Sequence, residues 1–302
     1  MLRKILMITS SNDLTCDYLV RLYSDISFFR LNFDKFSDYA IELNENGFSI
    51  KTGDEFIDSE SCRSIYYRKP TAENLSDVFE EKYHSFVHKE AYSLVEGIAE
   101  SFERRCLTRP SIMRRANNKA VQLILAKKIG FKIPSSSITN SPHNILKIGG
   151  QEKIVKPLAI GTVVSDGSKE FVQTNLLDER ISTSHLKYSP AYFQEYVAKD
   201  YEVRSTFVGR KEFSVKIKSE NRIDWRKMGN KMSYEETQLP ENIHAMCTLF
   251  MRALNMSFGC FDFIVRNGDV YFLEMNANGQ WAWLEKEVGV KISKSIVEYL
   301  NA

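Results

Sequence analysis

The chain has 302 residues, and its 43% hydrophobic and 26% charged residues are ordinary values for a globular protein with a large core. A net charge of +2 argues against a strong nucleic-acid-binding protein. Five scattered cysteines form no Cys-x-x-Cys pair, the N-terminal apolar run is too short for a signal peptide, and no run reaches membrane-spanning length. We therefore expect a cytoplasmic protein of two or three domains that contacts no membrane.

Residues 1–108 predict a small α/β domain. An Asn-Glu-Asn-Gly sequence within 41–50 predicts a hairpin, and apolar residues at helical spacing predict a helix over 81–104. Three apolar runs bounded by polar turns predict strands at 5–8, 28–33 and 64–67.

Two polar features of this first domain have competing interpretations. Arg68 and Lys69 end the third strand, where the favoured interpretation is a solvated strand end. His84 and His88 lie four residues apart on the helix and could share a metal, but surface histidines are the favoured interpretation because no third ligand is near.

Residues 109–188 predict a second domain. Asn118 is a suitable N-cap for a helix that ends at Gly130. A short strand then ends at Lys156 and leads into a loop that contains Gly161. A lysine and the backbone N–H groups of such a loop can hold phosphates, although the same pattern occurs in ordinary loops. No Gly-Lys-Ser/Thr sequence of a Walker loop is present.

Residues 189–302 predict a third domain with charged residues inside strands. Glu202 and Arg204 are two residues apart, so they share one face of a strand. They could line a ligand site or form a simple ion pair. Arg226 lies in a polar segment, where it could bind a substrate carboxylate with two hydrogen bonds or serve no such role.

The stretch 258–285 predicts a hairpin around Asn267 and Gly268, with acids inside its two apolar strands. Asp262 lies in the first strand, while Glu274 and Asn276 share one face of the second. Two carboxylates and an amide oxygen are suitable Mg²⁺ ligands. The alternative is that these acids lie on a solvated face of the hairpin.

The register of this hairpin decides whether the two acids can share a metal. A two-residue loop would place Asp262 and Glu274 on opposite faces of the sheet. A metal site therefore demands a loop with an odd number of residues or a compensating bulge. We predict a three-residue loop over 266–268, with Asp262 opposite Phe272.

These motifs resemble a known family. The sequences FDF and FLEMNANGQW resemble the metal-binding end of ATP-grasp ligases, and NGQWAWLE is most similar to the macrocyclases of microviridin-type peptides, the graspetides. The resemblance covers about residues 110–302 well and the first hundred residues weakly. Ala277 stands where that family often has proline.

The resemblance implies an α/β (α+β), three-domain ATP-grasp fold with the nucleotide between the central and C-terminal domains. It implies ATP and Mg²⁺ as cofactors. The implied nucleotide-binding set comprises two phosphate lysines, a glycine of the closing loop, two positions beside the adenine and a ribose-binding acid: Lys119, Lys156, Gly161, Glu195, Val197 and Glu202. The implied catalytic residues are Arg204, Lys216 and Arg226, and the implied metal ligands are Asp262, Glu274 and Asn276.

The implied activity joins Asp or Glu side chains of a ribosomally made precursor peptide to Ser, Thr or Lys side chains, after activation as acyl phosphates. Relatives suggest a homodimer. A ligase that adds an amino acid to a peptide or protein end would share the ATP-binding residues, and a non-catalytic nucleotide- or peptide-binding module is a further alternative.

Overall fold

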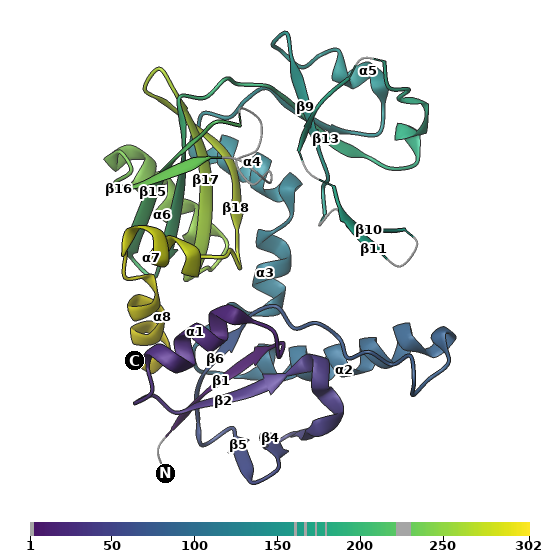
Figure 1. Ribbon diagram of the computed structural model, residues 1–302, viewed down its shortest axis with the longest axis vertical. Coiled ribbons are helices and arrows are strands. Elements are labelled where there is room, and N and C mark those ends of the chain that lie inside the picture. The colour runs from purple at the N-terminus through teal and green to yellow at the C-terminus, as the bar shows by residue number, and fades with distance from the viewer. Residues whose placement is uncertain (1–2, 160–161, 166–167, 173, 179, 222–230) are drawn as a thin grey trace.

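The computed structural model describes residues 3–159, 162–165, 168–172, 174–178, 180–221 and 231–302. An N-terminal domain lies below two further units, and helix α3 (Pro110–Ala116) leads from the lower part to the upper part (Figure 1). No described helix is both long and apolar enough to cross a membrane.

The N-terminal domain is built on a parallel sheet with strand order β2-β1-β6-β7. Its strands are β1 (Lys4–Thr9), β2 (Phe28–Asn32), β6 (Cys62–Tyr67) and β7 (Cys106–Leu107). A smaller antiparallel sheet contains β3 (Ala40–Asn44), β4 (Gly47–Thr52) and β5 (Glu55–Asp58), and a 3-10 helix, η1 (Phe33–Asp38), follows β2.

Alternation along β1 directs its side chains into two separate cores. Leu6 and Ile8 join the core that contains residues of α2 (Glu81–Ser101). Ile5 and Met7 join a core shared with α1 (Leu14–Leu22) and with the C-terminal helix α8 (Ile292–Asn301). The last helix of the chain therefore fastens the C-terminal part to the first domain.

The central unit is an antiparallel sheet with strand order β12-β9-β13-β8. Its elements are β8 (Ser136–Thr139), α5 (Pro142–Ile145), β9 (Lys153–Lys156), β12 (Asn175–Leu176), η2 (Ser184–Lys187) and β13 (Ala191–Glu195). A separate hairpin of β10 (Thr162–Ser165) and β11 (Ser168–Phe171) extends from this sheet toward the first domain (Figure 1).

The C-terminal unit is an antiparallel sheet with strand order β16-β15-β14-β17-β18. Its strands are β14 (Tyr201–Val208), β15 (Lys211–Ser219), β16 (Met232–Thr237), β17 (Phe258–Arg266) and β18 (Asp269–Asn276). One face packs on α4 (Lys119–Ile129) and α6 (Glu241–Ala253), and the other packs at one end on α7 (Ala282–Val288) and α8.

Both ends of the predicted second domain differ from the observed packing. The sequence boundary at residue 188 cuts β13 from the central sheet, although β13 pairs there with both β8 and β9. Helix α4, predicted to belong to the central domain, packs instead on the C-terminal sheet because its apolar residues join that core. Its predicted caps are correct: Asn118 accepts hydrogen bonds from the N–H groups of Ala120 and Val121, and Gly130 is left-handed with φ of 108°.

The β17–β18 hairpin places Asp262 and Glu274 on one face, but through a different feature from the predicted three-residue loop. Its turn has two residues, Asn267 and Gly268, whose φ angles of 49° and 82° suit a tight hairpin turn. The predicted three-residue loop is therefore wrong. The ladder instead shifts between Asp262 and the next residue, so one extra residue on β18 brings Glu274 directly opposite Asp262. This bulge performs the compensation that a shared metal site requires.

Candidate active site

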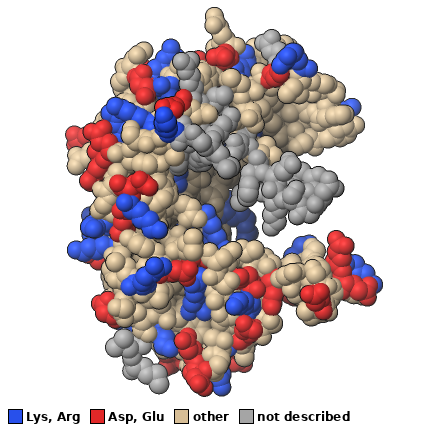
Figure 2. Space-filling view, in the orientation of Figure 1, with Lys and Arg blue, Asp and Glu red and all other residues tan. Residues whose placement is uncertain are grey.

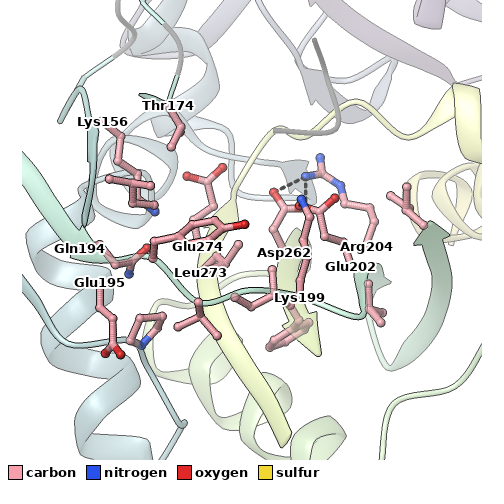
Figure 3. Close-up of a pocket in the computed structure, with 18 residues that line it drawn as sticks. Lys156, Thr174, Gln194, Glu195, Lys199, Glu202, Arg204, Asp262, Leu273 and Glu274 are labelled. Atoms are coloured by element: carbon pink, nitrogen blue, oxygen red, sulfur yellow. Dashed lines mark hydrogen bonds and ion pairs between the residues drawn. The ribbon is translucent and has the colours of Figure 1, made fainter. Parts of the chain in front are cut away.

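A cavity lies between the central sheet and the C-terminal sheet. Figure 3 shows charged side chains from both sheets directed toward it. The lining residues with a polar side chain are Lys156, Thr174, Gln194, Glu195, Tyr196, Lys199, Glu202, Arg204, Asp262 and Glu274. Apolar residues such as Ile154, Phe263 and Leu273 also line the cavity, and a lining of this mixed kind is common in cofactor sites.

The C-terminal wall of the cavity pairs each acid of the hairpin with a cation. Nη1 of Arg204 donates to both carboxylate oxygens of Asp262, at 2.7 and 2.6 Å. Nζ of Lys119 lies 2.5 Å from Oε2 of Glu274. Burial alone would lower the pKa of Arg204, but the Asp262 carboxylate outweighs this effect and holds the pKa above its usual value. This arginine therefore stays charged.

The residues Asp262, Glu274 and Asn276 fit a magnesium ion. They lie on one face of the hairpin, and the Asn276 amide nitrogen donates to Oδ2 of Asp262 at 3.1 Å and to Oε1 of Glu274 at 3.3 Å. The three polar groups thus converge on one point. Rotation of the amide would present its oxygen in place of its nitrogen, which gives three hard oxygen donors and leaves positions for phosphate oxygens.

The acid Glu202 lines the same cavity and is only 8% exposed. Nζ of Lys199 donates to its Oε1 at 2.9 Å. The side chain of Lys199 is only 7% exposed, and this lysine was not predicted as a site residue. Its position three residues before the acid, at the entrance to β14, is the sequence signal that could have found it.

The central wall of the cavity comes from β9 and β13. Lys156 is 9% exposed, and its Nζ lies 5.0 Å from the centre of the Tyr192 ring. Gln194, which was not predicted, lines the cavity with a buried Oε1 that has no hydrogen-bond partner among the described residues. An unsatisfied buried acceptor of this kind can receive a donor from a ligand.

The predicted adenine positions, Glu195 and Val197, both line the cavity. The side chain of Glu195 turns away from the charged wall (Figure 3) and lies against Gly150 and Ser135, whose N–H group is 3.4 Å from its Oε2. The backbone of Glu195 is thus the part of this residue that a base in the cavity could contact.

The remaining three predicted site residues are Gly161, Arg226 and Lys216. Gly161 and Arg226 lie outside the described residues. Lys216 requires a correction, because it pairs with Val203 and therefore lies on the sheet face opposite Arg204. Its Nζ is 4.4 Å from the centre of the Tyr201 ring and 3.7 Å from Oε2 of Glu235.

Arg68 also requires a correction, since it is completely buried and not a solvated strand end. Its Nη1 donates to Oδ1 of Asn278 and its Nη2 to Oε1 of Gln280, both at 3.1 Å. Its Nε donates to Oδ2 of Asp13 at 3.2 Å. Burial alone would raise the pKa of Asp13, but the charge of Arg68 and hydrogen bonds, among them those from Thr9 and Arg68, lower it to about 2.

The two helix histidines hold backbone carbonyls of the preceding loop. Nε2 of His84 lies 2.7 Å from the Phe79 carbonyl, and Nε2 of His88 lies 2.8 Å from the Glu73 carbonyl. Among the described residues, no cluster of three or more His, Cys, Asp or Glu suits a metal ion. These contacts agree with the favoured interpretation of structural surface histidines.

Family models match the chain in two consecutive parts. Residues 4–114 match the MvdD pre-ATP grasp domain, and residues 115–300 match the RimK-like ATP-grasp domain. No curated protein sequence matches the chain.

Several solved structures have a similar fold over the whole chain. A RiPP-associated ATP-grasp ligase from Chryseobacterium gregarium, in complex with ADP and a leader and core peptide, is 27% identical with a TM-score of 0.87, covering 99% of this chain and 96% of its own. The macrocyclase MdnC from Microcystis aeruginosa, bound with precursor peptide MdnA, is 22% identical with a TM-score of 0.87, covering 99% and 100%. The ATP-grasp ligase PsnB, complexed with minimal precursor, Mg and ADP, is 18% identical with a TM-score of 0.76, covering 98% and 96%.

Proposed function

Because the chain belongs to the RimK-like ATP-grasp family, we propose that it is a peptide macrocyclase that crosslinks a ribosomally made precursor. It is an ATP-grasp ligase that uses ATP and Mg²⁺. In the proposed reaction, Asp or Glu side chains of the precursor are joined to Ser, Thr or Lys side chains of the same peptide.

The observation that carries this proposal is the bulge that brings Asp262 opposite Glu274 beside the cavity. Asp262, Glu274 and Asn276 would hold Mg²⁺, which supplies charge neutralisation for the phosphates when bound. Lys156 on the central wall and Lys119 beside Glu274 would supply two more cations for phosphate oxygens, while Arg204, beside Asp262, would bind the reacting carboxylate. Phosphoryl transfer depends mainly on such positioning and electrostatic stabilisation.

The proposed reaction has two steps, activation of the carboxylate and attack on the activated carboxylate. A substrate carboxylate oxygen attacks the γ-phosphorus of ATP, which forms an acyl phosphate and releases ADP. A hydroxyl or amine of the same peptide then attacks the acyl carbon, loses its proton and expels inorganic phosphate. The peptide thus loses the elements of one water for each ATP consumed.

The peptide substrate is supported by the relatives. The Chryseobacterium gregarium ligase binds a leader and core peptide, and MdnC binds precursor peptide MdnA. An amino-acid ligase would use the same ATP-binding residues but would increase the mass of the peptide. The two activities therefore differ in product mass and in the substrate that stimulates ADP release.

The test is ADP release in the presence of ATP and Mg²⁺. A peptide that bears several Thr and Glu residues should stimulate it, whereas free glutamate should not. Stimulation by free glutamate alone, with an added amino-acid mass in the product, would contradict the macrocyclase proposal and favour the amino-acid ligase.

We also propose that the enzyme is a cytoplasmic homodimer that acts on peptides and not on nucleic acids or membranes. All five cysteines are free thiols, four of them buried, which suits a reducing compartment. The net charge of +2 gives little attraction to polyanions. Light scattering would test the dimer, because a monomer mass at working concentration would contradict it.

A further inference from the structure

The carboxyl edge of the N-terminal parallel sheet meets the loop that follows the metal-binding hairpin. Ligands commonly bind at this edge of parallel sheets. Lys69 follows Arg68 at the end of β6 and lies at this junction, where its side chain keeps access to solvent. Figure 2 shows a hollow between the N-terminal domain below and the units above, with Lys and Arg side chains at its back.

The backbone around Lys69 is held close to Arg204. The Asn278 side-chain amide donates to the Arg68 carbonyl, and Oγ of Ser10 donates to the Lys69 carbonyl at 3.0 Å. Gly279 follows Asn278, and a Cβ placed on it would lie 2.7 Å from Nη2 of Arg204. One short loop therefore contacts the strand end that carries Lys69 and the guanidinium of Arg204.

The charges at this junction do not balance. Arg68 is paired with Asp13, and Arg204 is paired with Asp262. The ammonium group of Lys69 forms no ion pair with any residue in the described part of the chain. Partial burial lowers the pKa of Lys69, and the positive charges of Arg68 and Arg204 lower it further. An anion bound here would relieve this repulsion.

Arg204 supplies a second observation that indicates a ligand. It is 5% exposed, yet its Nε has no hydrogen-bond partner among the described residues. A buried donor without an acceptor is costly, and an incoming carboxylate or acyl phosphate would satisfy it. An anion such as a carboxylate or an acyl phosphate would therefore suit both the free donor of Arg204 and the unpaired ammonium of Lys69.

We propose that Lys69 of the N-terminal domain binds the reacting carboxylate of the substrate together with Arg204 and so selects acidic side chains over their amides. This inference rests on the proposed ligase function and adds a substrate-binding residue from outside the two ATP-grasp units. Lys69 acts as a fixed cation and takes no proton from the attacking hydroxyl or amine.

The test compares binding of two synthetic peptides to the full chain with a non-hydrolysable ATP analogue and Mg²⁺. One peptide carries Thr and Glu residues, and the other has every Glu replaced by Gln. We expect the wild type to bind the Glu peptide about 10- to 100-fold more tightly, as a charged hydrogen bond provides. Lys69→Met should remove most of this preference, and affinity for the ATP analogue should stay within about twofold.

Two further variants make the result specific. Lys69→Arg keeps the positive charge and should retain the preference for Glu and the turnover within a few fold, whereas a proton-accepting role would make it as inactive as Lys69→Met. Lys51→Met removes an exposed lysine of the same domain and should change neither measurement.

Three results would overturn the inference: no preference for Glu in the wild type, an unchanged preference in Lys69→Met, or equal inactivity of Lys69→Arg and Lys69→Met. The binding measurement requires no ligation. A chain that selects Glu through Lys69 but forms no crosslink would therefore contradict the proposed function and leave the Lys69 site intact.

Discussion

Arg68 and Arg204 are both buried, but their surroundings differ. Every nitrogen of the Arg68 guanidinium has an acceptor, on Asp13, Asn278 or Gln280. Arg204 uses one nitrogen for both oxygens of Asp262 and keeps a buried Nε without a described partner. The first arginine is a permanent connection between domains, whereas the second retains donor capacity for a ligand. Unsatisfied hydrogen-bonding capacity, and not burial, therefore distinguishes Arg204 from Arg68.

The largest expected effect comes from replacing Arg68. Arg68→Met leaves Asp13 buried without its cation and frees the loop at Asn278 and Gln280, so it should lower the free energy of unfolding by about 3–5 kcal/mol. Urea denaturation measures this loss. Arg63→Met, which removes an exposed hydrogen bond to the Asn301 carbonyl, is the control and should cost less than about 1 kcal/mol. Equal losses in the two variants would remove the distinction between Arg68 and a surface arginine.

The next largest expected effect is on catalysis and comes from replacing Arg204. Arg204→Met should lower kcat about 10²–10³-fold, the usual loss for one transition-state electrostatic donor. Lys156→Ala should lose product formation to a similar extent for the same reason. A near-normal kcat in folded Arg204→Met would contradict the assignment.

The pH dependence of stability tests whether Arg68 stabilises the charged form of Asp13. The pKa of Asp13 is lowered from 3.8 to about 2 in the folded chain, so the group adds stability above about pH 4 and loses it as the pH falls toward 2. A shift of this size corresponds to roughly 2 kcal/mol. The difference in unfolding free energy between wild type and Asp13→Asn should therefore shrink between about pH 4 and pH 2. A difference that is constant over this range would show that Arg68 does not stabilise the charged carboxylate.

The smallest expected effect belongs to Lys216. Because it lies on the opposite sheet face from Arg204, Lys216→Met should change kcat by less than about twofold, and the loss of its exposed ion pair should cost less than about 1 kcal/mol. Steady-state kinetics beside Arg204→Met make this comparison. A loss as large as that of Arg204→Met would restore the sequence prediction for Lys216.

Sequence patterns predicted most of the local structure and the residues of the charged wall. Asn118 and Gly130 delimit their helix because capping depends on neighbouring residues. The residues of the charged wall were predicted because their order along the chain resembles the ATP-grasp pattern. The structure places five of them around the cavity: Lys156, Glu202, Arg204, Asp262 and Glu274.

The remaining features depend on contacts between distant segments. The bulge in β18 is an extra residue whose position no local motif marks, so the hairpin loop was predicted incorrectly. In the sequence Arg68 has the pattern of a solvated strand end. Its burial depends on Asn278 and Gln280, which lie more than two hundred residues later in the chain. Lys216 was misplaced because strand parity fixes its face only once the pairing of β14 with β15 is known.

The most direct test of the macrocyclase proposal is a mass measurement on a precursor-type peptide, such as one encoded beside this gene and rich in Thr and acidic residues. After incubation with the enzyme, ATP and Mg²⁺, we predict that the peptide loses one water for each ADP released. A product heavier by an amino acid, or ADP release with no change in peptide mass, would contradict the account.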